Sequence, residues 1–284
     1  MRTNKLCFTF MRTNKNSNLF LRVKKVLCYL LSILIWILLW QIVATNLAKE
    51  IFLPTPGKVM TVLTKDLLPS RTFWLSIRTS FVHIATGYFT GAALGIVLAC
   101  LSYMSEAIRM FLWFPIKIIK SIPVASFVIL TLLWCPSRKL SIFISFFMVF
   151  PVFYIHILEA LTQTDQKLLD MAKVFRVSFL KKIRYLYLPQ LFPFLFSASS
   201  LAVGMAWKSG IAAEIIGLSK DSIGNQLYQA KIYLMTPELF AWTFVIVFLS
   251  ILCEQMVKGV SFLLLRENRR KLYLSYSRKK GEKI

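Results

Sequence analysis

The chain has 284 residues, of which 57% are hydrophobic and 17% are charged, and its formal net charge is +23. Soluble domains of average composition carry about 25% charged residues, so this composition argues against a soluble globular protein. The charged residues are also clumped along the chain. They leave six windows without any Asp, Glu, Lys or Arg: residues 26–48, 79–105, 121–137, 140–158, 185–207 and 239–253.

These windows predict six transmembrane helices and an all-α membrane protein. A membrane-spanning helix needs about 20 mostly apolar residues, and four of the six windows reach that length. Window 121–137 is marginal, and window 239–253 is long enough only if the helix continues past Glu254 and Lys258. Those two side chains are four residues apart and can pair across one helical turn, so the extension is acceptable.

The basic residues are distributed unevenly around the predicted spans. With the N-terminus in the cytoplasm, 22 of the 35 Lys and Arg residues lie on the cytoplasmic side and nine on the opposite side. This is the positive-inside bias, so the net charge reflects membrane topology and does not indicate nucleic-acid binding. We expect a multi-pass protein of the cell membrane with three parts: a cytoplasmic basic tail (1–25), a transmembrane domain (26–265) and a second cytoplasmic basic tail (266–284).

The first apolar run, VLCYLLSILIWILLWQIV, is too long for the apolar region of a cleavable signal peptide, and no convincing cleavage site follows it. We therefore expect it to remain as the first span. In the second span Gly87, Gly91 and Gly95 lie four residues apart, which predicts a helix face that another helix can approach closely. Pro123, near the start of the third window, predicts a kink or a late helix start.

Motifs for catalysis are missing from the sequence. The nearest segment to the phosphate-binding motif G-x-x-x-x-G-K-[ST] is GMAWKS at 204–209, which lacks the second glycine. Only His83 and His156 could serve as histidine acid–base groups, and the five cysteines show no metal-binding spacing. We expect neither enzymatic activity nor a cofactor or metal in this chain.

A basic insert, residues 160–187, separates the fourth and fifth windows. Asp165 is a candidate N-cap for a first helix and Ser178 for a second, and Pro189 suits the first turn of the next span. Six apolar residues are spaced to share one helix face: Leu168, Ala172, Phe175, Phe179, Ile183 and Leu186. The pattern alone leaves two interpretations open, an amphipathic helix on membrane lipid and an element that docks onto a protein.

The insert resembles the EAA loop of ABC-transporter permeases, a cytoplasmic helix–loop–helix that docks into the ATPase subunit. In that pattern an acidic residue precedes two small residues, a glycine follows further on, and a hydrophobic–Leu–Pro sequence ends the motif. The matching positions here are Asp170, Met171, Ala172, Arg176, Leu188 and Pro189. Arg176 departs from the family pattern, since it stands where the family has its glycine. Glycine adopts a positive φ far more easily than arginine does, so this departure concerns the geometry of the turn.

Three further segments resemble permeases of the nitrate/sulfonate/taurine class. They are FLPTPGKV after the first span, KSIPVASF at the third, and GMAWKSGIAAEIIG with SIGNQLYQA between the last two. Together with the insert they follow the family order from about residue 26 to 265.

The resemblance implies a MetI-like permease fold and the role of permease subunit in an ABC importer, as a homodimer in the membrane lipid. ATP would be bound by two partner ATPase subunits, which would act on residues Asp170 to Ser178, and an extracytoplasmic solute-binding protein would deliver the solute. The resemblance also implies a translocation path near Trp207, Lys208 and Glu214, where Lys208 could attract an anion such as a sulfonate. In the alternative, Lys208 and Glu214 pair with each other or lie in an exposed loop.

Two other classes of protein remain as alternatives on the sequence. An ion-gradient-driven secondary transporter would be expected to show inverted repeats and buried acidic residues, and neither is seen in the sequence. In an accessory membrane protein, the EAA-like insert would be a coincidence.

Overall fold

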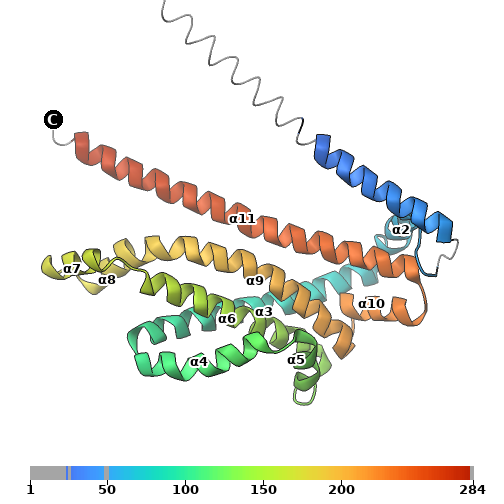
Figure 1. Ribbon diagram of the computed structural model, residues 1–284, viewed down its shortest axis with the longest axis horizontal. Helices are drawn as coiled ribbons and strands as arrows, with labels where there is room; N and C mark the ends of the chain where they lie inside the picture. The colour runs from blue at the N-terminus through green and yellow to red at the C-terminus, as the bar shows by residue number, and fades with distance from the viewer. Residues whose placement is uncertain (1–23, 25–26, 48–50, 282–284) are drawn as a thin grey trace, which may run out of the picture.

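The computed structural model describes residue 24, residues 27–47 and residues 51–281, with the backbone alone at Phe179 and beyond residue 261 (Figure 1). Every regular element in these ranges is helical. The elements are an N-terminal helix (Leu27–Leu47), α2 (Pro56–Thr61), the π-helical η1 (Val62–Leu67), α3 (Arg71–Met104), α4 (Glu106–Ser121), α5 (Val124–Thr131), α6 (Ser137–Thr162), α7 (Gln166–Val174), α8 (Phe179–Lys182), the π-helical η2 (Ile183–Tyr187), α9 (Leu188–Gly217), α10 (Ile223–Ile232) and α11 (Thr236–Gly281).

Five helices in the described ranges are long and apolar enough to cross a membrane, and the pair α4–α5 makes a sixth span if it is counted as one. The five are the N-terminal helix, α3, α6, the continuous stretch Leu180–Gly217 and α11. This agrees with the predicted all-α membrane protein of about six spans.

The predicted third span is corrected by the structure. Window 121–137 contains only α5, whose eight residues reach about 12 Å, and α5 is bent by 106° from α4. The bend lies at Pro123, as predicted, because a proline disfavours helical backbone in the residue before it. The helix that precedes the bend carries Lys117 and Lys120, so a search for windows without charge passes over it.

The glycine face of α3 packs directly against α6, as the sequence predicts. A Cβ atom on Gly91 would lie 2.8 Å from the carbonyl oxygen of Phe146, and one on Gly95 would lie 2.7 Å from that of Phe150. A Cβ on Gly87 would collide with the carbonyl oxygen of Ile142. Only glycine permits so close an approach of the two backbones.

The long helices α3, α6, α9 and α11 run along the long axis of the molecule, with α7 and α8 at one end and α2 and α10 at the other (Figure 1). We call these the α7 end and the α10 end. At the α10 end the N-terminal helix meets α11 through Trp40, whose ring stacks on Phe240 and Phe244 at 5.8 and 5.7 Å between centroids.

The two predicted tails lie largely outside the described side chains. Residues 1–25 fall outside the described residues except residue 24. The backbone of the predicted C-terminal tail continues α11 as a helix as far as Gly281. The 46 residues of α11 reach about 69 Å, more than twice the roughly 30 Å hydrocarbon core of a bilayer.

Candidate functional site

Three adjoining hollows cross one face of the bundle. The first, of about 490 Å³, lies between α4 and α6. The second, of about 300 Å³, shares Lys120 and Ile155 with the first and reaches α9. The third, of about 530 Å³, shares Leu201 and Met205 with the second and reaches α11. Because neighbouring hollows share residues, we treat them as one continuous feature and call it the basic groove.

The groove is lined by more cations than anions. Arg109, Lys117 and Lys120 enter it from α4 and Lys208 from α9, and all four are exposed. None of them forms an ion pair with another residue of the described chain. The Nζ of Lys117 lies 4.5 Å from the centre of the Trp113 ring, a cation–π distance.

The two carboxylates of the groove are engaged elsewhere. Oε1 of Glu159 accepts a hydrogen bond of 3.0 Å from Gln163, and Oε2 of Glu254 lies 3.9 Å from Nζ of Lys258. Charged side chains within spanning segments face water, a protein interior or a partner, because hydrocarbon does not solvate them. The basic groove therefore carries an excess of cations on a wall that is otherwise largely apolar, and its charge is suited to an anion.

Small residues on α9 keep the groove open. Ser197, Ser200 and Gly204 form part of its wall. A Cβ on Gly204 would lie 2.7 Å from Oε1 of Glu254, so the missing side chain lets this carboxylate of α11 rest against α9.

The three residues predicted for the translocation path do not lie together. Lys208 lines the groove. Trp207 is 2% exposed and its Nε1 donates a 3.0 Å hydrogen bond to the carbonyl of Ile246, which fastens α9 to α11. Glu214 is fully buried, and among the described ion pairs it has none with Lys208.

Glu214 is the centre of a buried polar cluster at the α10 end. The Ser80 hydroxyl donates to Oε2 of Glu214 over 2.6 Å, and the same hydroxyl accepts from the backbone N–H of Ile223 over 2.9 Å. The N–H of Gly224 also donates to Oε2, over 3.3 Å. A Cβ on Gly224 would collide with the Cβ of Glu214. The cluster thus fastens the first turn of α10 to α3 and α9.

Sequence reasoning missed the cations of α4 as site residues. The signal was present in their spacing, because Arg109, Lys117 and Lys120 follow one another at eight and three residues and so share a helix face. Ser80 was also missed, since nothing in the sequence connects it to a glutamate 134 residues away.

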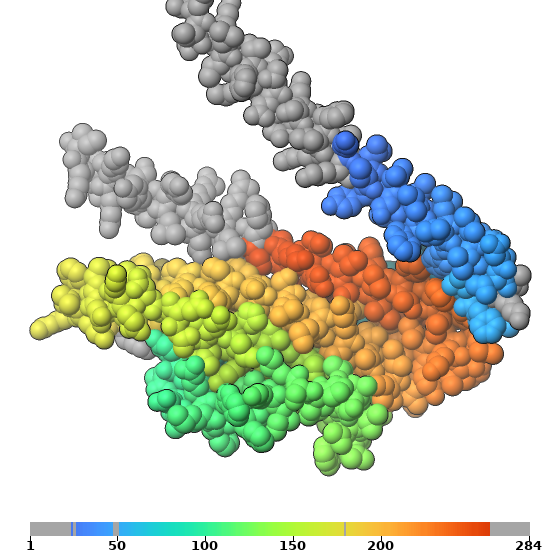
Figure 2. All heavy atoms as spheres, viewed as in Figure 1, coloured from blue at the N-terminus to red at the C-terminus, as the bar shows by residue number. Residues whose placement is uncertain are grey.

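The predicted coupling segment forms a helix–turn–helix that protrudes at the α7 end (Figure 1), and it is the yellow tip in Figure 2. As predicted, Asp165 caps α7, its carboxylate accepting a 2.9 Å hydrogen bond from the N–H of Lys167. The second helix, α8, begins at Phe179, directly after Ser178. Leu188 and Pro189 are the first residues of the α-helical segment α9, as predicted, but helical backbone already precedes them in α8 and η2.

Arg176 has a φ of 48°, the left-handed conformation for which glycine is the usual residue. The N–H of Val177 donates to the carbonyl of Ala172, and the N–H of Arg176 donates to that of Lys173, both over 3.0 Å. This pair of bonds is a Schellman motif, which ends α7 and turns the chain toward α8. The position therefore has the backbone that the EAA-loop glycine would supply, with arginine in its place.

The turn at Arg176 separates the six apolar residues that were predicted to share one helix face, so that prediction is wrong. Of the six, Ala172 is 5% exposed and packs inward, whereas Phe175 is 73% exposed. Val174 and Leu180, which were not among the six, are 79% and 78% exposed. Met171 is half exposed, and Asp170 forms an exposed 3.2 Å ion pair with Lys173. The tip thus presents apolar side chains beside a charged pair.

Five or six apolar helices, a cation-lined groove and a protruding helix–turn–helix at one end are the features expected of the membrane-spanning subunit of a transporter, a permease. The chain belongs to the family of binding-protein-dependent transport system inner membrane components, whose model matches residues 91–260. It is therefore the membrane-spanning permease subunit of an ABC importer, a class that works with an ATPase and a binding protein. This excludes the two alternative classes.

Named relatives and a solved structure agree with this assignment. The putative aliphatic sulfonates transport permease SsuC of Bacillus subtilis is 26% identical over 226 residues, covering 78% of this chain and 80% of the relative. The bicarbonate transport system permease CmpB of Synechococcus elongatus is 26% identical over 217 residues, covering 72% and 77%. A bacterial ABC transporter that imports alginate shares the fold, with a TM-score of 0.55 and 18% identity over 80% of this chain and 95% of that one.

Proposed function

We propose that the chain conducts a small anion, with the basic groove as the path. The observation that carries this proposal is the set of four exposed cations in the groove, Arg109, Lys117, Lys120 and Lys208, that have no acidic partner among the described residues. Sulfonates and bicarbonate, which the names of the two relatives give as their solutes, are anions. In a partly desolvated groove, unpaired cations attract such a solute more strongly than they would in water.

The working unit in this proposal is a homodimer. The groove is an open hollow of the single chain, and its four cations are exposed. A second copy placed against this hollow would enclose the cations in a shared, water-filled path.

The α7–α8 tip is the proposed contact to the ATPase subunit, with Asp170, Met171 and Ala172 in α7 and Arg176 and Ser178 in the turn that follows it. Its exposed apolar side chains support a docking role, because such patches mark sites of protein contact. This places the α7 end in the cytoplasm, in line with the positive-inside bias, and directs the α10 end toward the binding protein.

Coupling in this proposal uses one long helix. The stretch Leu180–Gly217 is continuous over 38 residues, about 57 Å, and runs from the tip through the groove wall to the Glu214 cluster. Closure of the ATPase pair would move the tip, and a rigid helix would carry that movement past Lys208 to the α10 end.

Solute uptake into liposomes tests the anion path. We expect Lys120→Gln and Lys208→Gln each to lower ATP-driven uptake at least tenfold, in the complex assembled with its ATPase and binding protein. Arg78→Gln is the matched control, because Arg78 is an exposed cation in α3 outside the groove. Equal uptake by all three variants and the wild type would refute the proposal.

Deletion of residues 172–180 tests the docking of the tip. We expect the shortened chain to insert in the membrane but to lose co-purification with the ATPase. Retention of the ATPase at wild-type stoichiometry would contradict the assignment of the tip and would leave the anion path untouched.

A further inference from the structure

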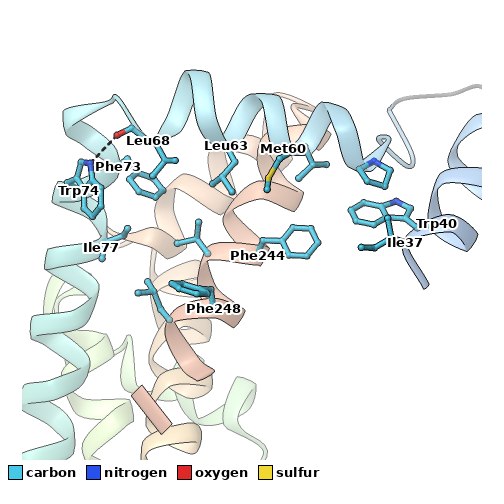
Figure 3. Close-up of a pocket in the computed structure, with 14 residues that line it drawn as sticks. Ile37, Trp40, Met60, Leu63, Leu68, Phe73, Trp74, Ile77, Phe244 and Phe248 are labelled. Atoms are coloured by element: carbon cyan, nitrogen blue, oxygen red, sulfur yellow. Dashed lines mark hydrogen bonds between the residues drawn. The ribbon is translucent and has the colours of Figure 1, made fainter. Parts of the chain in front are cut away.

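The cavities of the bundle differ in the side chains that line them. The cavity in Figure 3, of about 690 Å³ at the α10 end, has an apolar and aromatic lining. The second hollow of the basic groove is smaller, about 300 Å³, and its described walls are apolar except for Lys120 of α4 and His156 of α6. These two side chains therefore determine which polar groups of a solute the second hollow can hold.

His156 is oriented by its own helix. Its Nδ1 lies 2.9 Å from the carbonyl oxygen of Val152, one turn earlier in α6. A carbonyl oxygen can only accept a hydrogen bond, so Nδ1 is the donor. In a neutral imidazole this fixes the proton on Nδ1 and leaves the lone pair on Nε2.

The Nε2 atom of His156 is available to a solute. It has no hydrogen-bond partner among the described residues, and it is not one of their buried polar atoms. Because Nδ1 is turned toward the α6 backbone, Nε2 lies at the opposite edge of the ring, and this half-buried side chain lines the hollow. The hollow thus presents a hydrogen-bond acceptor together with the ammonium group of Lys120.

An acceptor and a cation in one hollow favour a solute with two different groups. The ammonium group attracts an anionic group, whereas a lone pair on Nε2 repels anionic oxygens and accepts only from an O–H or N–H group. The apolar walls strengthen both interactions by lowering the local dielectric constant. A solute without a donor would displace water from Nε2 and provide no hydrogen bond in return, which is unfavourable.

We propose that His156 is a specificity-determining residue of the basic groove, which selects small anions that also carry a hydroxyl or N–H group. Such a solute places its anionic group at Lys120 and donates a hydrogen bond to Nε2 of His156. This inference rests on the proposed function, since it requires that the solute passes along the groove.

Protection of a single thiol measures binding in this hollow without the selectivity of a binding protein. Met205 lines the second and third hollows, and Met205→Cys is introduced into the full-length chain with its five native cysteines replaced by alanine, assembled with its ATPase. A neutral methanethiosulfonate modifies the thiol, and a bound anion slows the reaction. The probes are ethanesulfonate and 2-hydroxyethanesulfonate, which differ by one hydroxyl group.

The hydroxylated anion is expected to protect the thiol at the lower concentration. At about pH 8, above the ordinary titration range of imidazole, the half-protecting concentrations should differ by roughly threefold to tenfold, the size of one hydrogen bond. His156→Phe keeps a ring and removes the acceptor, so both anions should then protect equally, with the value for ethanesulfonate unchanged. His156→Gln supplies an amide oxygen as acceptor and should restore part of the preference.

His83→Phe is the matched control, because His83 lies in α3 and lines none of the three hollows. It should keep the full preference. Equal protection by the two anions with His156 in place, or an equal loss for both anions in His156→Phe, would overturn the role of His156 and leave the anion path intact. Failure of both anions to protect the thiol in every variant would instead refute the path itself, and this inference with it.

Discussion

Arg176 adopts the backbone conformation that was expected of a glycine at this position, although its side chain is that of an arginine. Its φ of 48° and the two hydrogen bonds of the Schellman motif reproduce the geometry that a glycine would provide. A left-handed conformation costs a residue with a Cβ about 1–2 kcal/mol. Arginine at this position therefore carries local strain.

Replacement of this arginine by glycine should stabilise the tip. We expect Arg176→Gly to slow amide hydrogen exchange in α7 by about threefold to fivefold, because the strain is relieved while the glycine gains some freedom in the unfolded chain. Arg176→Ala keeps the Cβ and removes the charge, and it should give no such protection. Equal protection in both variants would mean that charge, and not φ, limits the stability of the tip.

Gly91 illustrates close packing at the residue scale. Alanine normally stabilises a helix interior relative to glycine by roughly 0.5–1 kcal/mol, but a Cβ here would lie 2.8 Å from the carbonyl oxygen of Phe146. We expect Gly91→Ala to lower the thermal midpoint of the detergent-purified protein, with a loss of about 1–3 kcal/mol from overpacking.

The control for that prediction lies in α11. A Cβ on Gly259 would meet no atom within 4 Å, so Gly259→Ala should leave the midpoint unchanged or raise it slightly. A glycine face that tolerates alanine as well as Gly259 does would contradict the packing of α3 on α6.

At the scale of elements, the position of α10 depends on two hydrogen bonds that share one hydroxyl group, that of Ser80. Ser80 joins Glu214 of α9 to the N–H of Ile223. Ser80→Ala would leave the buried N–H of Ile223 without this acceptor, a loss of about 1–3 kcal/mol. We expect faster amide exchange in α10 with little change in α6.

Ser145 supplies the comparison for Ser80. It is also fully buried, but its hydroxyl donates a 3.2 Å hydrogen bond to the carbonyl of Ala206 and not to the Glu214 cluster. Ser145→Ala should therefore leave the exchange of α10 unchanged. If both substitutions loosen α10 equally, the loss is one of packing and the Ser80 bridge is not what holds the helix.

At the scale of the whole molecule, the features that depend on local sequence were predictable. Apolar length located most of the spans, the spacing of Gly87, Gly91 and Gly95 identified a packing face, and Pro123 identified a break. Asp165 and Pro189 mark helix starts by their own chemistry. The effect of a helix cap or of a proline depends on residues that are close in the sequence, so it can be predicted without knowledge of the fold.

The features that depend on distant contacts were not predictable. The helix α4 carries several charges, so its sequence does not read as an apolar span, although its lysines line a groove. Trp207 and Glu214 resemble pathway residues in the sequence, but contacts with α11, α3 and α10 bury them. The burial that distinguishes these two residues from the exposed Lys208 arises only when the helices pack together.

The electrostatic character of the basic groove can be measured directly through a cysteine placed in its wall. Ser197 is an exposed groove residue, and Ser197→Cys in a background with the five native cysteines replaced by alanine gives one reactive thiol. We expect an anionic methanethiosulfonate to modify this thiol faster than a cationic one of similar size, relative to their rates with a free thiol. The preference should shrink when Lys208→Gln is added. A cationic reagent that reacts as fast or faster would contradict the anion path.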